Sequence, residues 1–351
     1  MTIYISHITA LECWRSGRFD ARLRVPCSGK RVRHPVGSSE LIGDADKAAR
    51  ARSRDADTAA FFQGRKAVDV DRARGDSLLL ESGLPLGRVS RESPVHVVVP
   101  CTCDRIDRVG VRCHVHARPF PPGSFVRLDE GLYASSPELC FVQMASVLPA
   151  LELLALGFEL CGTYARNCDG RTRYGRPMLL TTVSALARYV ESARGIPGAA
   201  AARRVLKHLV ACSASPRETA LTLLLCLPRR MGGYALSHPE LNYRMDVPDA
   251  RRDCTEKGYY LCDLYWSQAK LDVEYESDEC HTGPSRIARD SERRDDLSHL
   301  GVSVRTMTNH QIMDLARFDK AARQLAAALG ERVRPYDGFA QACRMLRAAV
   351  L

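Results

Sequence analysis

No run of about 18 consecutive apolar residues occurs in the 351-residue chain, so we expect no membrane-spanning helix. Its first residues, MTIYISHITALECW, lack the basic start and the long apolar core of a signal peptide. We therefore expect a cytoplasmic protein. In that setting its 14 cysteines would be reduced and would mostly act as small buried hydrophobes.

The chain also lacks the Cys-x-x-Cys pair of a zinc knuckle. The stretch CTCDRIDRVGVRCHVH does contain side chains of the types that bind zinc. These side chains are Cys101, Cys103, Cys113, His114 and His116. The end of the stretch, VRCHVH, alternates like a strand, so we favour a pair of strands over a zinc site here.

The balance of charge is positive, with a formal net charge of +10 and an isoelectric point near 9.0. Such a balance suits a polyanionic partner, nucleic acid above all. A moderate excess of this kind does not locate the binding surface.

The pattern of elements predicts four segments. Residues 1–90 form an N-terminal segment, in which 29–77 is polar, charged and rich in alanine and is expected to be a mobile helix or linker. Residues 91–210 form a small α+β and helical region, and 211–330 an α/β domain. Residues 331–351 form a helical tail. Taken together, these segments predict a fold that is α/β in its core and α+β overall.

The α/β domain is expected to hold one mixed sheet flanked by helices. Apolar alternation predicts strands near 259–266, 270–277 and 302–307, the first two joined as a hairpin. Helices are predicted near 216–226 and 286–300.

Carboxylates gather on this predicted hairpin. Asp263 lies in the first strand, and Glu274 and Glu276 share one face of the second. Neighbouring carboxylates repel one another, and Mg²⁺ or Mn²⁺ would relieve that repulsion because hard cations take oxygen ligands. The alternative is that Glu274 and Glu276 belong with Asp272 to the solvated face of an amphipathic strand.

Five short motifs follow in order along this part of the chain. They are Ser215-Pro216-x-Glu218, Asp263, Glu274-x-Glu276, His281, and Asp290-x-x-Arg293-x-x-x-Leu297-x-x-x-Gly301. This order, over about residues 211–315, resembles the PD-(D/E)xK endonuclease-like superfamily. The resemblance is greatest to the branch that holds the very-short-patch repair endonucleases and the DUF559 proteins.

The resemblance implies a restriction-endonuclease-like fold and a metal-dependent DNA endonuclease, acting in DNA repair or phage defence. It implies Mg²⁺ or Mn²⁺ held by Asp263, Glu274 and Glu218, with Glu276 and His281 completing the catalytic set. Three features depart from the superfamily pattern. Glu276 stands where the motif lysine is expected, Ser277 stands where the branch has glycine, and His281 lies one residue further on than in the commonest version.

Two further assignments have alternatives. Ser215 and Glu218 also fit a capping box with Pro216 at the first helical position, which would explain Glu218 without a metal. Arg286 and Arg293 could contact DNA phosphates or could simply belong to a solvated helix face.

The front part weakly resembles AbiEi-like antitoxins, through HITALECWR and SPELCFVQMASVL. That resemblance implies the alternative function, a non-catalytic DNA-binding regulator or antitoxin with a relic nuclease fold. DNA is the expected partner in both cases, no membrane is expected, and a homodimer or a toxin partner stays open.

Overall fold

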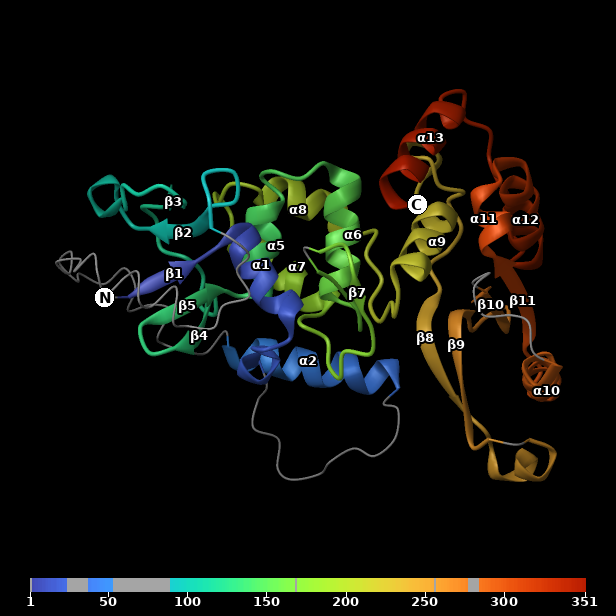
Figure 1. The fold of residues 1–351 in the computed structure, drawn as a ribbon. Helices are drawn as coiled ribbons and strands as arrows, with labels where there is room; N and C mark the ends of the chain where they lie inside the picture. The colour runs from blue at the N-terminus through green and yellow to red at the C-terminus, as the bar shows by residue number, and fades with distance from the viewer. Residues whose placement is uncertain (1, 24–36, 53–88, 168, 256, 277–283) are drawn as a thin grey trace. The chain divides into compact units, whose positions relative to one another are not determined.

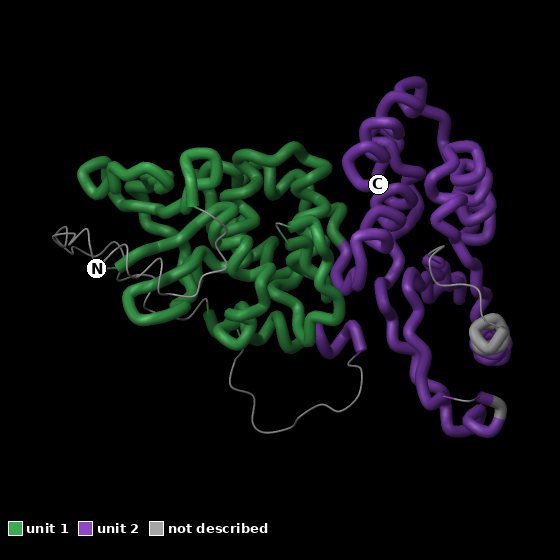
Figure 2. Tube along the Cα trace, in the orientation of Figure 1, with its two compact units in different colours: residues 1–31, 42–209 green, residues 32–41, 210–351 purple. Residues whose placement is uncertain are grey.

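The computed structural model describes the chain in two compact units (Figures 1 and 2). It does not describe residues 1, 24–36, 53–88, 168, 256 and 277–283, nor the side chains of 254 and 284–290. The first unit contains residues 1–31 and 42–209, and the second contains 32–41 and 210–351. The chain therefore divides between Leu209 and Val210.

A five-stranded mixed sheet organises the first unit, in the order β3-β2-β1-β5-β4. Its strands are β1 (Ile3–Ile5), β2 (Val95–Val99), β3 (Val111–Val115), β4 (Phe125–Asp129) and β5 (Leu132–Ser135). β1 lies parallel to β5 and antiparallel to β2, and β2 lies parallel to β3. The chain thus inserts its first strand into the middle of a sheet built from residues about 90 to 130 positions later.

Helices complete the first unit. They are α1 (His7–Ser16), α2 (Ser38–Arg52), α5 (Pro137–Met144), α6 (Ala150–Leu160), α7 (Val183–Ser192) and α8 (Ala199–Leu206). The first residues of α2 belong to the second unit. The first unit also contains a small hairpin of β6 (Ala165–Arg166) and β7 (Thr172–Arg173). The Ser136 hydroxyl caps α5 by accepting the Leu139 N–H. Gly198 precedes α8 at φ +93, and a Cβ there would lie 2.0 Å from the Val142 carbonyl oxygen, so only glycine fits.

Two features of the first unit differ from the sequence-based expectations, and a third agrees in part. The first strand and helix belong to the same unit as residues 91–209, because β1 pairs with β2 and β5. Of the segment expected to be a mobile helix or linker, 38–52 is helix α2, while 29–36 and 53–77 lie outside the described part of the chain. Cys101 and Cys103 are joined by a disulfide, which corrects the expectation that every cysteine is reduced.

The second unit contains a four-stranded sheet in the order β11-β10-β9-β8. Its strands are β8 (Glu240–Asp246), β9 (Tyr259–Trp266), β10 (Leu271–Glu276) and β11 (Ser303–Thr308). β9 is antiparallel to both β8 and β10, while β10 runs parallel to β11. The three predicted strands are therefore confirmed and adjacent, whereas β8 was not predicted.

The helices of the second unit include the two that were predicted. They are α9 (Pro216–Cys226), α10 (Pro284–His299), α11 (Asn309–Met313), α12 (Leu315–Ala328) and α13 (Phe339–Val350). Leu297 of α10 packs against a core on the sheet that includes Tyr260, Cys262 and Tyr265. α10 crosses between the parallel strands β10 and β11 and ends at Gly301, whose φ is +81.

Both units thus mix helices with strands, which confirms the α+β class. Within the described ranges, no helix combines the length and the apolar character needed to cross a bilayer.

Candidate active site

Asp263 lies where the ladders of β9 become irregular. Pairing of β8 with β9 places Asn242 opposite Asp263, and Asn242 has a left-handed φ of +48. Pairing of β9 with β10 reaches Val273 and Leu264, so the next pair in register would be Glu274 with Asp263. Instead, Oδ2 of Asp263 accepts the backbone N–H of Tyr275 at 3.0 Å. The Asp263 carboxyl therefore stands between β9 and β10, where the two strands part.

Glu218 approaches this point from the start of α9. Ser215 caps the helix by accepting the Glu218 N–H at 3.1 Å. The Glu218 carboxylate does not accept the backbone N–H of Ser215, as a full capping box would require; it accepts the Ala214 N–H at 2.8 Å and Asn242 Nδ2 at 2.6 Å. Helix capping accounts for the role of Ser215. It does not account for the Glu218 carboxyl, which is only 7% exposed and is hydrogen-bonded to Asn242 on β8, opposite Asp263.

Asp272 is the most buried acid of the group, with 0% of its surface exposed. Neither carboxyl oxygen makes a hydrogen bond of ordinary geometry within the described part of the chain, although the Cys262 thiol lies close enough to lower its pKa in part. The expectation that Asp272 belongs to a solvated face is therefore wrong.

The electrostatic state of the cluster follows from this burial. Burial raises the pKa of Asp272 to about 8, and the charges of Glu274 and Asp263 add to the effect. Burial, together with the charge of Glu218, raises the pKa of Asp263 to about 7. Burial also raises the pKa of Glu218, against the hydrogen bonds it accepts. Three neighbouring carboxyl groups are thus crowded enough to resist ionisation.

Glu274 is neutralised from α10. Arg293 Nε donates to Glu274 Oε1 at 2.8 Å, and Arg293 Nη2 donates to the same oxygen and to the Leu261 carbonyl. Their side chains are only 25% and 22% exposed, so this ion pair is well shielded. Arg293 was expected to contact DNA phosphates; in the structure its guanidinium is directed into the cluster.

The predicted ligands do not converge to coordination distance. Among the described residues, no three of these acids bring one oxygen each within 4.8 Å of one another. Each of two carboxyls is anchored elsewhere, because Asp263 accepts the Tyr275 N–H and Glu274 is paired with Arg293. Glu276 ends β10, partly buried and paired in register with Thr308. His281 and the side chain of Arg286 lie outside the described residues.

Sequence reasoning missed two members of the site. Asn242 belongs to β8, which the alternation of Leu241, Tyr243 and Met245 could have revealed. The burial of Asp272 had no sequence signal, because it depends on α10 covering the sheet.

The donor set fits a hard divalent cation. It consists of carboxylate oxygens, the ligand type that suits Mg²⁺ and Mn²⁺, and the buried Asp272 carboxyl accepts no hydrogen bond of ordinary geometry among the described residues. Among the described residues of the first unit, His7, His96 and His114 could also hold a metal ion, and so could Cys101, Cys103 and Asp104 once the disulfide between the two cysteines is reduced.

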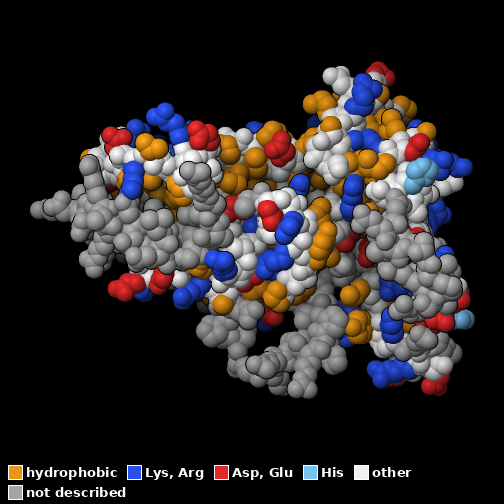
Figure 3. Space-filling view, viewed as in Figure 1, with side chains coloured by type: hydrophobic (Ala, Val, Ile, Leu, Met, Phe, Trp, Pro, Cys, Tyr) orange, Lys and Arg blue, Asp and Glu red, His pale blue; other side chains and the backbone are white. Residues whose placement is uncertain are grey.

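The described side chains on one face of the molecule do not mark a binding surface for a polyanion. On the face shown in Figure 3, the described Lys and Arg side chains are interspersed with acidic and hydrophobic ones rather than gathered in one stripe. Comparisons with protein-family models, with curated proteins and with solved structures gave no match.

Proposed function

We propose that the second unit is a metal-dependent DNA endonuclease with a restriction-endonuclease-like fold. The order α9, β8, β9, β10, α10, β11 supports this, because it agrees with the order of motifs on which the resemblance to the PD-(D/E)xK superfamily rests. The observation that carries the proposal is the crowding of Glu218, Asp263 and Asp272, three carboxyls from three elements with raised pKa values. Glu218 and Asp272 are buried, and Asp263 is half-buried.

The chain's own residues have separable roles in this proposal. Asp263 and Glu218 would hold the cation, and the Tyr275 N–H and Asn242 orient their carboxylates. A bound Mg²⁺ supplies an activated water and a positive charge for the phosphodiester oxygens. In the hydrolysis one P–O bond would form to the water oxygen and one P–O ester bond would break, and the proton lost by the water would be balanced by protonation of the leaving oxygen. The assistance of His281 in that proton transfer stays a prediction.

Arg293 gives the site a fixed positive charge that the motif lysine would otherwise provide. Arg293 donates to Glu274 through Nε and Nη2, and Nη1 takes no part in that pair. A guanidinium beside the metal ligands would stabilise charge that develops on the phosphate. Arg293 therefore acts within the site rather than along the DNA backbone.

The same ion pair favours a second candidate, a DNA-binding regulator with a relic nuclease fold. Arg293 already neutralises Glu274, and Glu276 occupies the position of the motif lysine. In that case the second unit would bind DNA without cutting it.

Nicking of supercoiled plasmid separates the two functions. The wild type should nick DNA with Mg²⁺ or Mn²⁺ and stop when EDTA is added. Asp263→Asn should lower the rate by about 100-fold or more, since losing a metal ligand costs several kcal/mol of transition-state stabilisation. Asp249→Asn is the matched control, because the Asp249 side chain is 90% exposed.

DNA affinity, measured by fluorescence anisotropy at two salt concentrations, should remain unchanged or rise slightly in Asp263→Asn, because a negative charge is removed. A regulator predicts DNA binding with no cutting by the wild type in either metal. Equal, metal-independent cutting by the wild type and Asp263→Asn would contradict the assignment.

A further inference from the structure

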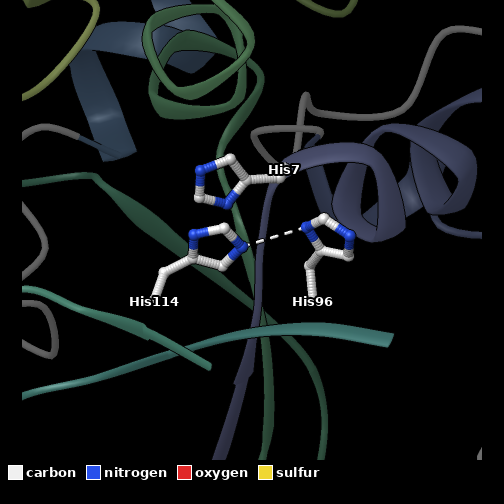
Figure 4. A group of neighbouring side chains, drawn as sticks. All are labelled: His7, His96 and His114. Atoms are coloured by element: carbon white, nitrogen blue, oxygen red, sulfur yellow. Dashed lines mark hydrogen bonds between the residues drawn. The ribbon is translucent and has the colours of Figure 1, made fainter. Parts of the chain in front are cut away.

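The sheet of the first unit brings together three histidines that are far apart in the sequence. His7 begins α1 directly after β1, His96 lies in β2 and His114 in β3, and these strands are neighbours in the order β3-β2-β1. Nδ1 of His96 lies 3.0 Å from Nε2 of His114, and the ring of His7 stacks on that of His114 with centroids 3.7 Å apart (Figure 4). One ring nitrogen from each residue lies within 4.8 Å of the other two.

The backbone of His7 is held in an unusual conformation. Its φ of +50 is uncommon for a residue with a side chain, and such conformations gather at functional sites. Its N–H donates to Gln143 Oε1 at 3.0 Å, and its carbonyl accepts from the Cys140 thiol. Two residues of α5 thus fix the position from which the His7 ring projects over β2 and β3.

We propose that His7, His96 and His114 form a binding site for a divalent transition-metal ion of the zinc type. Three imidazoles without a carboxylate suit Zn²⁺ and Co²⁺ and do not suit Mg²⁺ or Ca²⁺. Two nitrogens on a tetrahedral zinc at 2.0–2.1 Å would be about 3.3 Å apart, close to the 3.0 Å between His96 and His114. This site lies in the first unit and is independent of the carboxylate cluster.

The protonation state supports the proposal. Burial lowers the pKa of His7 to about 3 and that of His114 to about 4, with neighbouring histidines and Arg112 adding to the effect. Burial also lowers the pKa of His96. All three rings are therefore neutral at pH 7, and each offers a lone pair to a metal without first losing a proton.

Binding requires one change of tautomer and one side-chain movement. The tautomer changes because His96 and His114 are hydrogen-bonded to each other, so one of the two facing nitrogens carries a proton. A metal lies in the plane of each ring that binds it, and the rings of His7 and His114 are stacked with only 21° between their planes. The His7 ring must turn from this stacked position. The hydroxyl of Ser6, 3.0 Å from His7 Nδ1, can then fix the tautomer that leaves Nε2 free. Three protein ligands leave the fourth position to water, as in catalytic zinc sites.

Calorimetric titration of the EDTA-treated full-length chain with Zn²⁺ tests the site. The wild type should bind one Zn²⁺ at these residues, and His96→Gln and His114→Gln should each weaken that binding by about 100-fold. His116→Gln is the matched control, since His116 follows β3 and stacks on Phe120 outside the cluster. Circular dichroism checks that each variant is folded.

Two alternatives give different results. If, with a reductant present to open their disulfide, Zn²⁺ binds instead at Cys101 and Cys103, the affinity will fall in Cys103→Ser and persist in the histidine variants, which overturns the proposal. No stoichiometric binding by the wild type also overturns it, and leaves the histidines as a packed cluster. Should the histidine variants unfold, the Co²⁺ spectrum of the wild type decides. A four-coordinate visible band without a thiolate charge-transfer band is expected, and a thiolate band or a weak six-coordinate spectrum contradicts the site.

Discussion

Replacing Asp272 with asparagine should remove a large part of the pH dependence of stability in the second unit. The folded pKa of Asp272 is raised to about 8, against 3.8 when unfolded. Between these values the native state keeps a proton that the unfolded chain releases, so the free energy of unfolding falls as the pH rises. At about 1.4 kcal/mol per pH unit, with the curve flattening near pH 8, the loss from pH 5 to pH 8 is on the order of 3 kcal/mol. Asparagine does not titrate and cannot contribute this loss.

Urea denaturation at pH 5 and pH 8, followed by tryptophan fluorescence, measures the effect. The chain has two tryptophans, and a Trp14→Phe background leaves Trp266, which is buried in the second unit, as the reporter. The buried amide adds a pH-independent cost of about 1–3 kcal/mol, so the slopes against pH are compared rather than single values. Asp263, with a pKa of about 7, keeps a smaller slope of the same sign in the variant. Asp249→Asn should keep the wild-type slope, and parallel profiles for the wild type and Asp272→Asn would refute the reasoning.

Two further predictions concern the ion pair and the first unit. Arg293→Gln should destabilise the second unit by about 1–3 kcal/mol, because Glu274 loses its partner in a shielded site. Adding Glu274→Gln should restore part of the loss, and a double-mutant cycle from urea denaturation in which the two changes are additive would contradict the coupling. Gly198→Ala should lower the melting temperature of the first unit, because its Cβ would lie 2.0 Å from a carbonyl oxygen of α5 at a φ of +93. An unchanged melting temperature would rule out that close approach.

Local patterns predicted the elements of the second unit well. The strands at Tyr259–Trp266 and Leu271–Glu276 follow from apolar alternation, and the short turn between them sets the register that brings Asp263 beside β10. The helix start at Ser215 follows from its capping hydroxyl and Pro216. Each of these features depends on residues close together in the chain, which is why sequence alone could reveal it.

Long-range contacts could not be predicted in the same way. The pairing of Arg293 with Glu274 depends on the phase at which α10 packs on the sheet. The histidine cluster depends on β1 pairing with a strand some 90 residues later, so His7 and His96 carried no signal. The disulfide of Cys101 with Cys103 likewise had no warrant in their spacing.

Binding of Mn²⁺, counted by electron paramagnetic resonance, tests the central claim most directly. A His114→Gln background removes the histidine cluster as a second acceptor of metal. In that background the chain should bind one Mn²⁺, and both Asp263→Asn and Glu218→Gln should lose it while Asp249→Asn retains it. Equal Mn²⁺ affinity with and without the Asp263 carboxylate would contradict a metal site at the point where β9 and β10 part.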